Sequence, residues 1–165
     1  MNEQTVPGQA TPDQAPPDQT VADQTAAQLV TRHEIRRFAF AVGATSPIHH
    51  DLAAARARGY PDLVAPAFFF TTLGLSLGRF LPPGQLREDG LARDDEVVGR
   101  VVAGDTTIEW SGAIVAGDEL RVTQRFLGRR SKVGRSGPFT IFDYTRSYTV
   151  DGHQVVLERL ARIAR

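Results

Sequence analysis

The sequence contains no cysteine, and lysine occurs only once, at Lys132. The absence of cysteine excludes disulfide bonds, thiol catalysis, thiolate zinc sites and iron–sulfur clusters. Excess charge is also absent, because nineteen basic residues balance nineteen acidic residues. The chain as a whole therefore gives no indication of binding to nucleic acid or to a membrane surface. Residues 1–4 show neither the basic start nor the apolar stretch of a secretory signal, so we expect a cytoplasmic protein.

The length and the hydrophobic content predict one folded domain with an arm in front of it. The 165 residues are 41% hydrophobic, which suffices for a single core. Residues 1–28 hold four prolines and six glutamines but no aromatic residue. Such a segment cannot bury enough apolar surface to offset the entropy lost on ordering. We therefore predict a disordered arm over residues 1–28 and a folded domain over residues 29–165.

Three helices are predicted in the first half of the folded domain. Thr31 and Glu34 have the spacing of a capping box, which begins a helix over residues 32–42. A second, shorter helix is predicted over residues 51–58. Residues 66–80 are apolar on nearly every side, which predicts a helix buried in the core.

The second half of the chain alternates between apolar and polar residues, which predicts β-strands. The strands are expected at residues 106–110, 120–127, 139–150 and 155–163. An antiparallel sheet must cover its apolar face, and a helix that is apolar on all sides must be surrounded. These requirements predict an α+β fold in which an antiparallel sheet wraps around a central apolar helix. A single sheet of this kind has open edges, which favours association with a second chain.

Four segments resemble the MaoC-type hydratases and dehydratases, which have the hot-dog fold and act on acyl thioesters. The matching segments are Phe38–Gly43, Ser46–Asp51, Ala53–Tyr60 and Val64–Phe68. The chain also resembles the N-terminal, substrate-binding type of MaoC domain. The resemblance implies a single hot-dog domain that binds a 3-hydroxyacyl or enoyl thioester of coenzyme A or of a carrier protein. It also implies a homodimer, or a heterodimer with another hot-dog chain, and no cofactor.

The resemblance places the catalytic histidine of the family at His49. The family motif Gly-Asp-x-Asn-Pro-Ile-His-x-Asp begins at Gly43, and its Asn position is occupied by Ser46, which joins His49 as a catalytic candidate. The catalytic Asp of the motif is replaced by Ala44, which has no acid–base chemistry. Hydration needs one group for the proton of water and another for the proton at Cα. His49, with an ordinary pKa of about 6.5, is suited to one of these roles at neutral pH.

The resemblance also places several residues along the bound thioester. These candidates for substrate binding are Asp51, Tyr60, Pro66, Ala67 and Phe68. A basic segment over residues 128–137 is predicted to be a hairpin loop in which Arg129, Arg130 and Lys132 meet a phosphate of coenzyme A or of a phosphopantetheine arm. A solvated loop without a ligand is the alternative interpretation of that segment. No metal site is expected, because adjacent histidines rarely converge on one ion without further ligands.

Our interpretation of the sequence is a hydratase or dehydratase of acyl thioesters. Two alternatives follow from Ala44. In the first, the chain is a non-catalytic subunit that holds the acyl chain while a partner supplies an intact Asp and His. In the second, the chain adds an amine or a hydroxyl group, rather than water, to an enoyl thioester.

Overall fold

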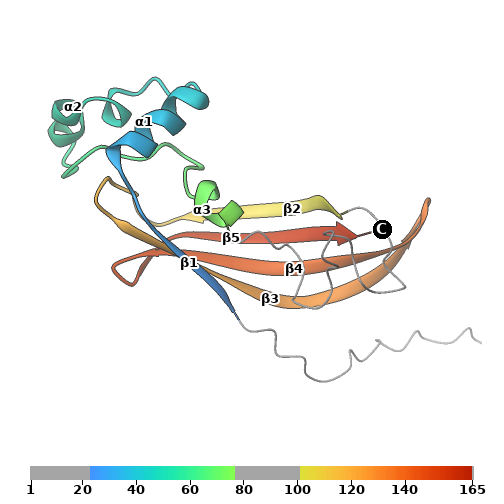
Figure 1. Ribbon diagram of the computed structural model, residues 1–165. Helices are drawn as coiled ribbons and strands as arrows, with labels where there is room; N and C mark the ends of the chain where they lie inside the picture. Colours follow the sequence, from blue (N-terminus) through green and yellow to red (C-terminus); the bar gives the residue numbers. More distant parts are fainter. Residues whose placement is uncertain (1–22, 77–100, 165) are drawn as a thin grey trace, which may run out of the picture.

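A five-stranded antiparallel sheet forms the body of the described structure, and the first two α-helices, labelled α1 and α2, lie together at one end of it (Figure 1). The computed structural model describes residues 23–76 and 101–164. The strand order across the sheet is β1-β3-β4-β5-β2. The strands are β1 (Gln24–Leu29), β2 (Val101–Trp110), β3 (Glu119–Gly134), β4 (Gly137–Val150) and β5 (His153–Ala164). In the described part of the chain no helix is long and apolar enough to cross a membrane.

The folded domain begins earlier in the chain than predicted, because residues 24–29 form strand β1. It pairs antiparallel with β3 from Gln24, opposite Gln124, to Leu29, opposite Glu119. The predicted boundary at residue 28 is therefore wrong for residues 24–28, and residues 1–22 of the predicted arm lie outside the described residues. An edge strand needs only backbone pairing and alternate contacts with the sheet, so a polar segment without aromatic residues can supply it.

Helices α1 (Arg32–Ala41) and α2 (Leu52–Ala57) form as their start signals predict. The Thr31 hydroxyl accepts a hydrogen bond from the Glu34 amide, and the Glu34 carboxylate accepts one from the Thr31 amide. This capping box satisfies amide groups that have no partner inside the helix. The Asp51 carboxylate caps α2 in the same way, by accepting from the Ala53 amide at 2.8 Å. Between the two helices lies a single 3₁₀ turn, η1 (Pro47–His49).

The third helix, α3 (Thr71–Ser76), begins five residues later than predicted. Pro66 is followed by turns in which the Phe69 amide donates to the Pro66 carbonyl oxygen at 3.1 Å. Phe68 adopts a left-handed backbone conformation, with φ of +67°. A right-handed helix cannot continue through such a residue, so the predicted start at Pro66 is wrong. Residues 77–80 of the predicted helix lie outside the described residues.

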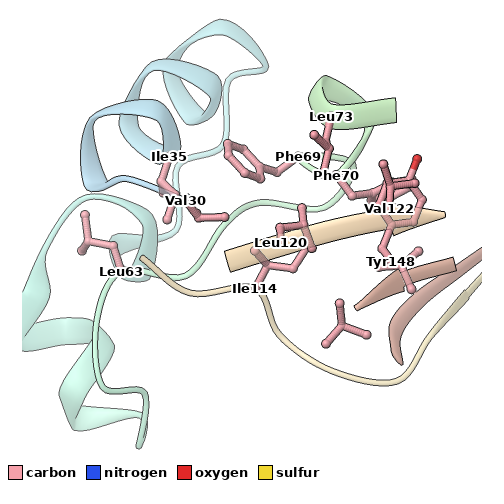
Figure 2. Packing of buried hydrophobic residues seen from close by; sticks show 12 residues of the cluster. Val30, Ile35, Leu63, Phe69, Phe70, Leu73, Ile114, Leu120, Val122 and Tyr148 are labelled. Carbon is pink, nitrogen blue, oxygen red and sulfur yellow. The ribbon is translucent and has the colours of Figure 1, made fainter. Parts of the chain in front are cut away.

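The main core lies where α1 and α3 meet the sheet (Figure 2). Phe70 packs edge-on against the ring of Tyr148 on β4, with ring centroids 4.8 Å apart. Val122 and Val156, on the strands that flank β4, and Leu73 of α3 are buried in the same cluster. Burial of large apolar side chains at this junction fixes α3 on one face of the sheet.

A row of polar side chains crosses the same face of the sheet. Gln24, Gln124, Arg146 and Glu158 occupy paired positions on β1, β3, β4 and β5. The Arg146 guanidinium donates to the Gln124 side-chain oxygen at 2.8 Å and to the Glu158 carboxylate at 3.4 Å. The Tyr148 hydroxyl also donates to the Glu158 carboxylate, at 3.3 Å, and burial raises the pKa of this hydroxyl. Because Arg146 and Glu158 are both buried, their charges must compensate each other inside the fold.

Candidate functional site

His49 is fixed by a hydrogen bond between its ring and the backbone of a distant segment. Its Nδ1 atom lies 2.7 Å from the carbonyl oxygen of Val64. A carbonyl oxygen only accepts, so Nδ1 must carry the hydrogen in this contact. In the neutral ring, Nε2 is therefore the unprotonated nitrogen and a proton acceptor. The structure thus gives His49 both a structural contact and a basic atom.

The segment that His49 holds is itself bonded to the segment between β2 and β3. The Val64 amide donates to the Ile48 carbonyl oxygen at 3.1 Å, so η1 and Val64 are joined by two hydrogen bonds. Val64 also forms an isolated antiparallel bridge with Val115, and the Ala65 amide donates to the Ile114 carbonyl oxygen at 2.8 Å. Val115 lies just before β3 in the chain. His49 therefore connects the motif turn to the residues that lead into the Pro66 turn.

The remaining motif residues lie in the same turn but have different partners. The Ser46 carbonyl oxygen accepts from the His49 amide at 3.2 Å, whereas the Ser46 side chain makes no capping hydrogen bond. The Ala44 amide donates to the Ala39 carbonyl oxygen, and the Ala44 carbonyl oxygen lies 2.8 Å from the His50 Nε2 atom. The Asp51 carboxylate caps α2. Among the described residues, no group of three or more His, Cys, Asp or Glu side chains is arranged to hold a metal ion.

The predicted substrate-binding residues near Pro66 lie close to this turn in the chain. Pro66 is buried, two residues beyond Val64, while Ala67 and Phe68 are exposed. The Phe68 ring packs against Trp110 at the end of β2, with centroids 6.2 Å apart. Tyr60 is half-buried just after α2, and its amide donates to the Ala55 carbonyl oxygen.

The predicted basic loop is not a loop, because β3 and β4 continue to a tight turn at residues 135–136. Arg129, Arg130 and Lys132 lie within β3, paired with residues of β4. The prediction failed because cross-strand pairing overrides the local preference of a glycine-rich, basic segment for a loop. Arg130 forms an ion pair with Asp143 at 2.9 Å.

The structure does not bring these basic residues to the His49 turn within one chain. β3 begins at Glu119, opposite Leu29 and next to α1, and Arg129 follows ten residues later. At a strand rise of about 3.3 Å per residue, this separation is roughly 30 Å. Figure 1 shows the β3–β4 turn at the end of the sheet opposite α1 and α2.

Sequence reasoning missed a set of residues on the outer side of α1. Arg36, Arg37, Phe40 and Ala41 line a surface depression together with His50. The Arg36 guanidinium donates to the His50 carbonyl oxygen at 3.2 and 3.3 Å, which ties α1 to the motif turn. The only sequence signal was the recurrence of these residues on one helical face, and a solvated face shows the same pattern.

An exposed ion pair ties the start of α1 to the turn that precedes Val64. Arg32 holds the Asp62 carboxylate through two hydrogen bonds of 2.6 and 2.7 Å. These bonds lower the pKa of Asp62 from 3.8 to about 2. A lowered pKa stabilises the fold above the ordinary pKa of the group, and that stabilisation disappears as the pH falls through the folded value.

We expect this ion pair to produce a small loss of stability in acid. Between about pH 4 and pH 2 the free energy of unfolding of the wild-type chain should fall by up to about 1 kcal/mol more than that of the Asp62→Asn variant. The difference is small because solvent screens an ion pair near the surface. Urea unfolding at both pH values measures the difference. Parallel pH dependence in the two proteins would show that Asp62 contributes nothing.

Solved structures define the class of protein to which this fold belongs. The ChsH1-ChsH2 complex from Mycobacterium tuberculosis superposes with a TM-score of 0.65 at 18% identity, over 86% of this chain and 86% of that chain. The HadBC (3R-hydroxyacyl-ACP dehydratase) complex from the same organism gives 0.63 at 22% identity, over 87% and 96%. A MaoC-like dehydratase gives 0.67 at 25% identity, over 88% of this chain and 42% of that chain. The α+β hot-dog fold of the MaoC-like proteins, which the sequence predicted, is confirmed.

Sequence relatives then define the family. The family described as "FAS1-like, dehydratase domain region" matches residues 19–158. A UPF0336 protein of Saccharopolyspora erythraea is 31% identical over 139 residues, which cover 82% of this chain and 81% of that protein. A UPF0336 protein of Clavibacter michiganensis is 42% identical over 97 residues, 58% of this chain and 59% of that protein's own length. The chain belongs to the FAS1-like dehydratase-region family, and UPF0336 proteins are its relatives.

Proposed function

We propose that this chain is the acyl-thioester-binding subunit of a two-chain MaoC-like dehydratase. The observation that carries the proposal is the methyl group of Ala44 at the position of the family's acid, beside a histidine that is retained. The part of the reaction that needs two proton-transferring groups is then left to a partner chain. Both Mycobacterium tuberculosis structures in the comparison are complexes, and one of them, HadBC, is a dehydratase, which supports a two-chain assembly.

The role of His49 in such a subunit is to position the binding segment. Its Nδ1 hydrogen bond fixes Val64, and Val64 leads directly to the Pro66 turn. The resemblance places this turn beside the thioester. Nε2 makes no hydrogen bond to another described residue, which favours a second candidate function, in which His49 acts as a lone general base and the chain hydrates enoyl thioesters by itself.

Restoring the missing acid separates the two functions. We expect the wild-type chain to bind an acyl thioester without hydrating an enoyl thioester above background. Ala44→Asp should then raise hydration by about 100-fold, the lower range for a positioned acid–base group, whereas Ala44→Asn should not. The absorbance of the enoyl thioester measures turnover. Efficient hydration by the wild-type chain alone, unchanged in Ala44→Asp, would contradict the subunit proposal.

A further inference from the structure

Two depressions along α1 share two of their lining residues, and we refer to the pair as one groove. The first, of about 280 Å³, is lined by Phe38 and Phe69 and reaches Thr72 of α3. The second, of about 570 Å³, is the one lined by Arg36, Phe40 and His50. Arg37 and Ala41 line both depressions, so the two adjoin at these residues of α1. We call the first the apolar compartment and the second the basic compartment.

The compartments differ in chemistry. In the apolar compartment the Phe38 and Phe69 rings pack edge-to-face, with centroids 5.5 Å apart. Glu34 lies at its rim, where its carboxylate already accepts hydrogen bonds from Thr31 and Gln28. The basic compartment presents two guanidinium groups and no carboxylate among its lining residues. Its Phe40 side chain is 88% exposed, although large apolar side chains on a helix normally pack against something.

The two arginines are not neutralised by acids in the described residues. Arg36 donates to the His50 carbonyl oxygen, which leaves its positive charge in place and holds the guanidinium beside the motif turn. Arg37 is exposed and forms no ion pair within residues 23–76 and 101–164. Guanidinium groups bind phosphate oxygens through charge-assisted hydrogen bonds. The groove therefore suits a ligand with a neutral arm and an anionic phosphate end.

We propose that this groove holds the pantetheine arm of the acyl thioester, with its terminal phosphate between Arg36 and Arg37. This inference rests on the proposed function and adds a subsite to it. The neutral arm passes Ala41 and enters the apolar compartment. Phe69 lines this compartment and its amide donates to the Pro66 carbonyl oxygen, so the compartment adjoins the Pro66 turn. The phosphate is common to coenzyme A and to the phosphopantetheine group of a carrier protein. The phosphate subsite thus lies on α1 and not on the distant basic strands.

The test compares the same saturated acyl group on pantetheine, on phosphopantetheine and on coenzyme A, with binding to the purified full chain measured by calorimetry. We expect the phosphate to strengthen binding by about tenfold in the wild-type protein, and this gain to shrink at high salt. In Arg37→Gln the gain should disappear. The matched control is Arg135→Gln, which removes an exposed arginine at the β3–β4 turn and should keep the full gain.

The outcomes distinguish the subsite from the function. If all three thioesters bind the wild-type chain equally, the subsite is wrong while the binding function stands. If the gain in affinity from the phosphate is lost in Arg135→Gln but not in Arg37→Gln, the subsite is also wrong, and the phosphate binds near the β3–β4 turn. If no thioester binds, both proposals fail. A further measurement uses the same acyl group loaded on a carrier protein. If this thioester binds more tightly than the pantetheine thioester, and if Arg37→Gln removes the difference, the phosphate in the subsite comes from the carrier protein.

Discussion

Replacing Arg146 with methionine should lower the free energy of unfolding by about 3–5 kcal/mol. Arg146 and Glu158 have side chains only 5% and 9% exposed, and their charged groups lie 3.4 Å apart. Removal of Arg146 leaves the buried Glu158 carboxylate without its ion-pair partner, and this penalty is what the expected loss reflects. Urea unfolding followed by circular dichroism measures the change.

The matched control for Arg146→Met is the double variant with Glu158→Gln. Glu158→Gln removes the remaining buried negative charge but keeps a side-chain oxygen that accepts from the Tyr148 hydroxyl. We therefore expect the double variant to recover most of the lost stability, because an ion pair replaced by neutral groups often costs little. Equal losses in the single and double variants would show that packing of Arg146, and not charge, stabilises the sheet.

His49→Ala should destabilise the domain and weaken thioester binding, whereas His49→Asn should do neither. The alanine variant leaves the Val64 carbonyl oxygen without its donor, which costs about 1–3 kcal/mol. The amide nitrogen of asparagine stands as far from Cβ as Nδ1 does, so it preserves this hydrogen bond while removing the Nε2 atom. Thermal unfolding and calorimetric binding of an acyl thioester give both quantities.

The same pair of variants separates the positioning role of His49 from a catalytic role. For a binding subunit, the affinity of His49→Asn for acyl thioesters should equal that of the wild-type chain. If His49 is a general base in a chain that is catalytic by itself, His49→Asn should lose about 100-fold in turnover while staying folded. If the wild-type chain shows measurable hydration and His49→Asn loses it in this way, the second candidate function is favoured.

Local signals predicted the parts of the fold that depend on neighbouring residues. The capping box of Thr31 and Glu34 forms as expected, because its groups lie three residues apart. The Asp51 cap is similarly local. Asp151 and Gly152 form the turn that joins β4 and β5, and an Asp-Gly pair favours this turn through its own backbone preferences.

The candidate site was only partly predictable, because some of its contacts join residues that are distant in the sequence. The motif placed His49, Ser46 and Ala44 in one turn, but the partner of the His49 ring is Val64, fifteen residues away. The basic compartment depends on Arg36 and Arg37 of α1 meeting His50. No spacing in the sequence encodes a contact between a helix face and a turn that returns to it after fourteen residues.

The caps, the hairpin turn, the motif turn and the loss of the family's acid at Ala44 each reside in a few consecutive residues, so the sequence is enough to specify them. Only the assembled fold shows that residues 24–28 join the sheet and that residues 129–134 extend it. It alone shows, too, that Arg146 finds Glu158 in the core. These outcomes arise from backbone pairing and burial between segments distant in the chain. A strand is stabilised by its neighbours in the sheet, and a charge is tolerated in the core only where the fold brings it a partner.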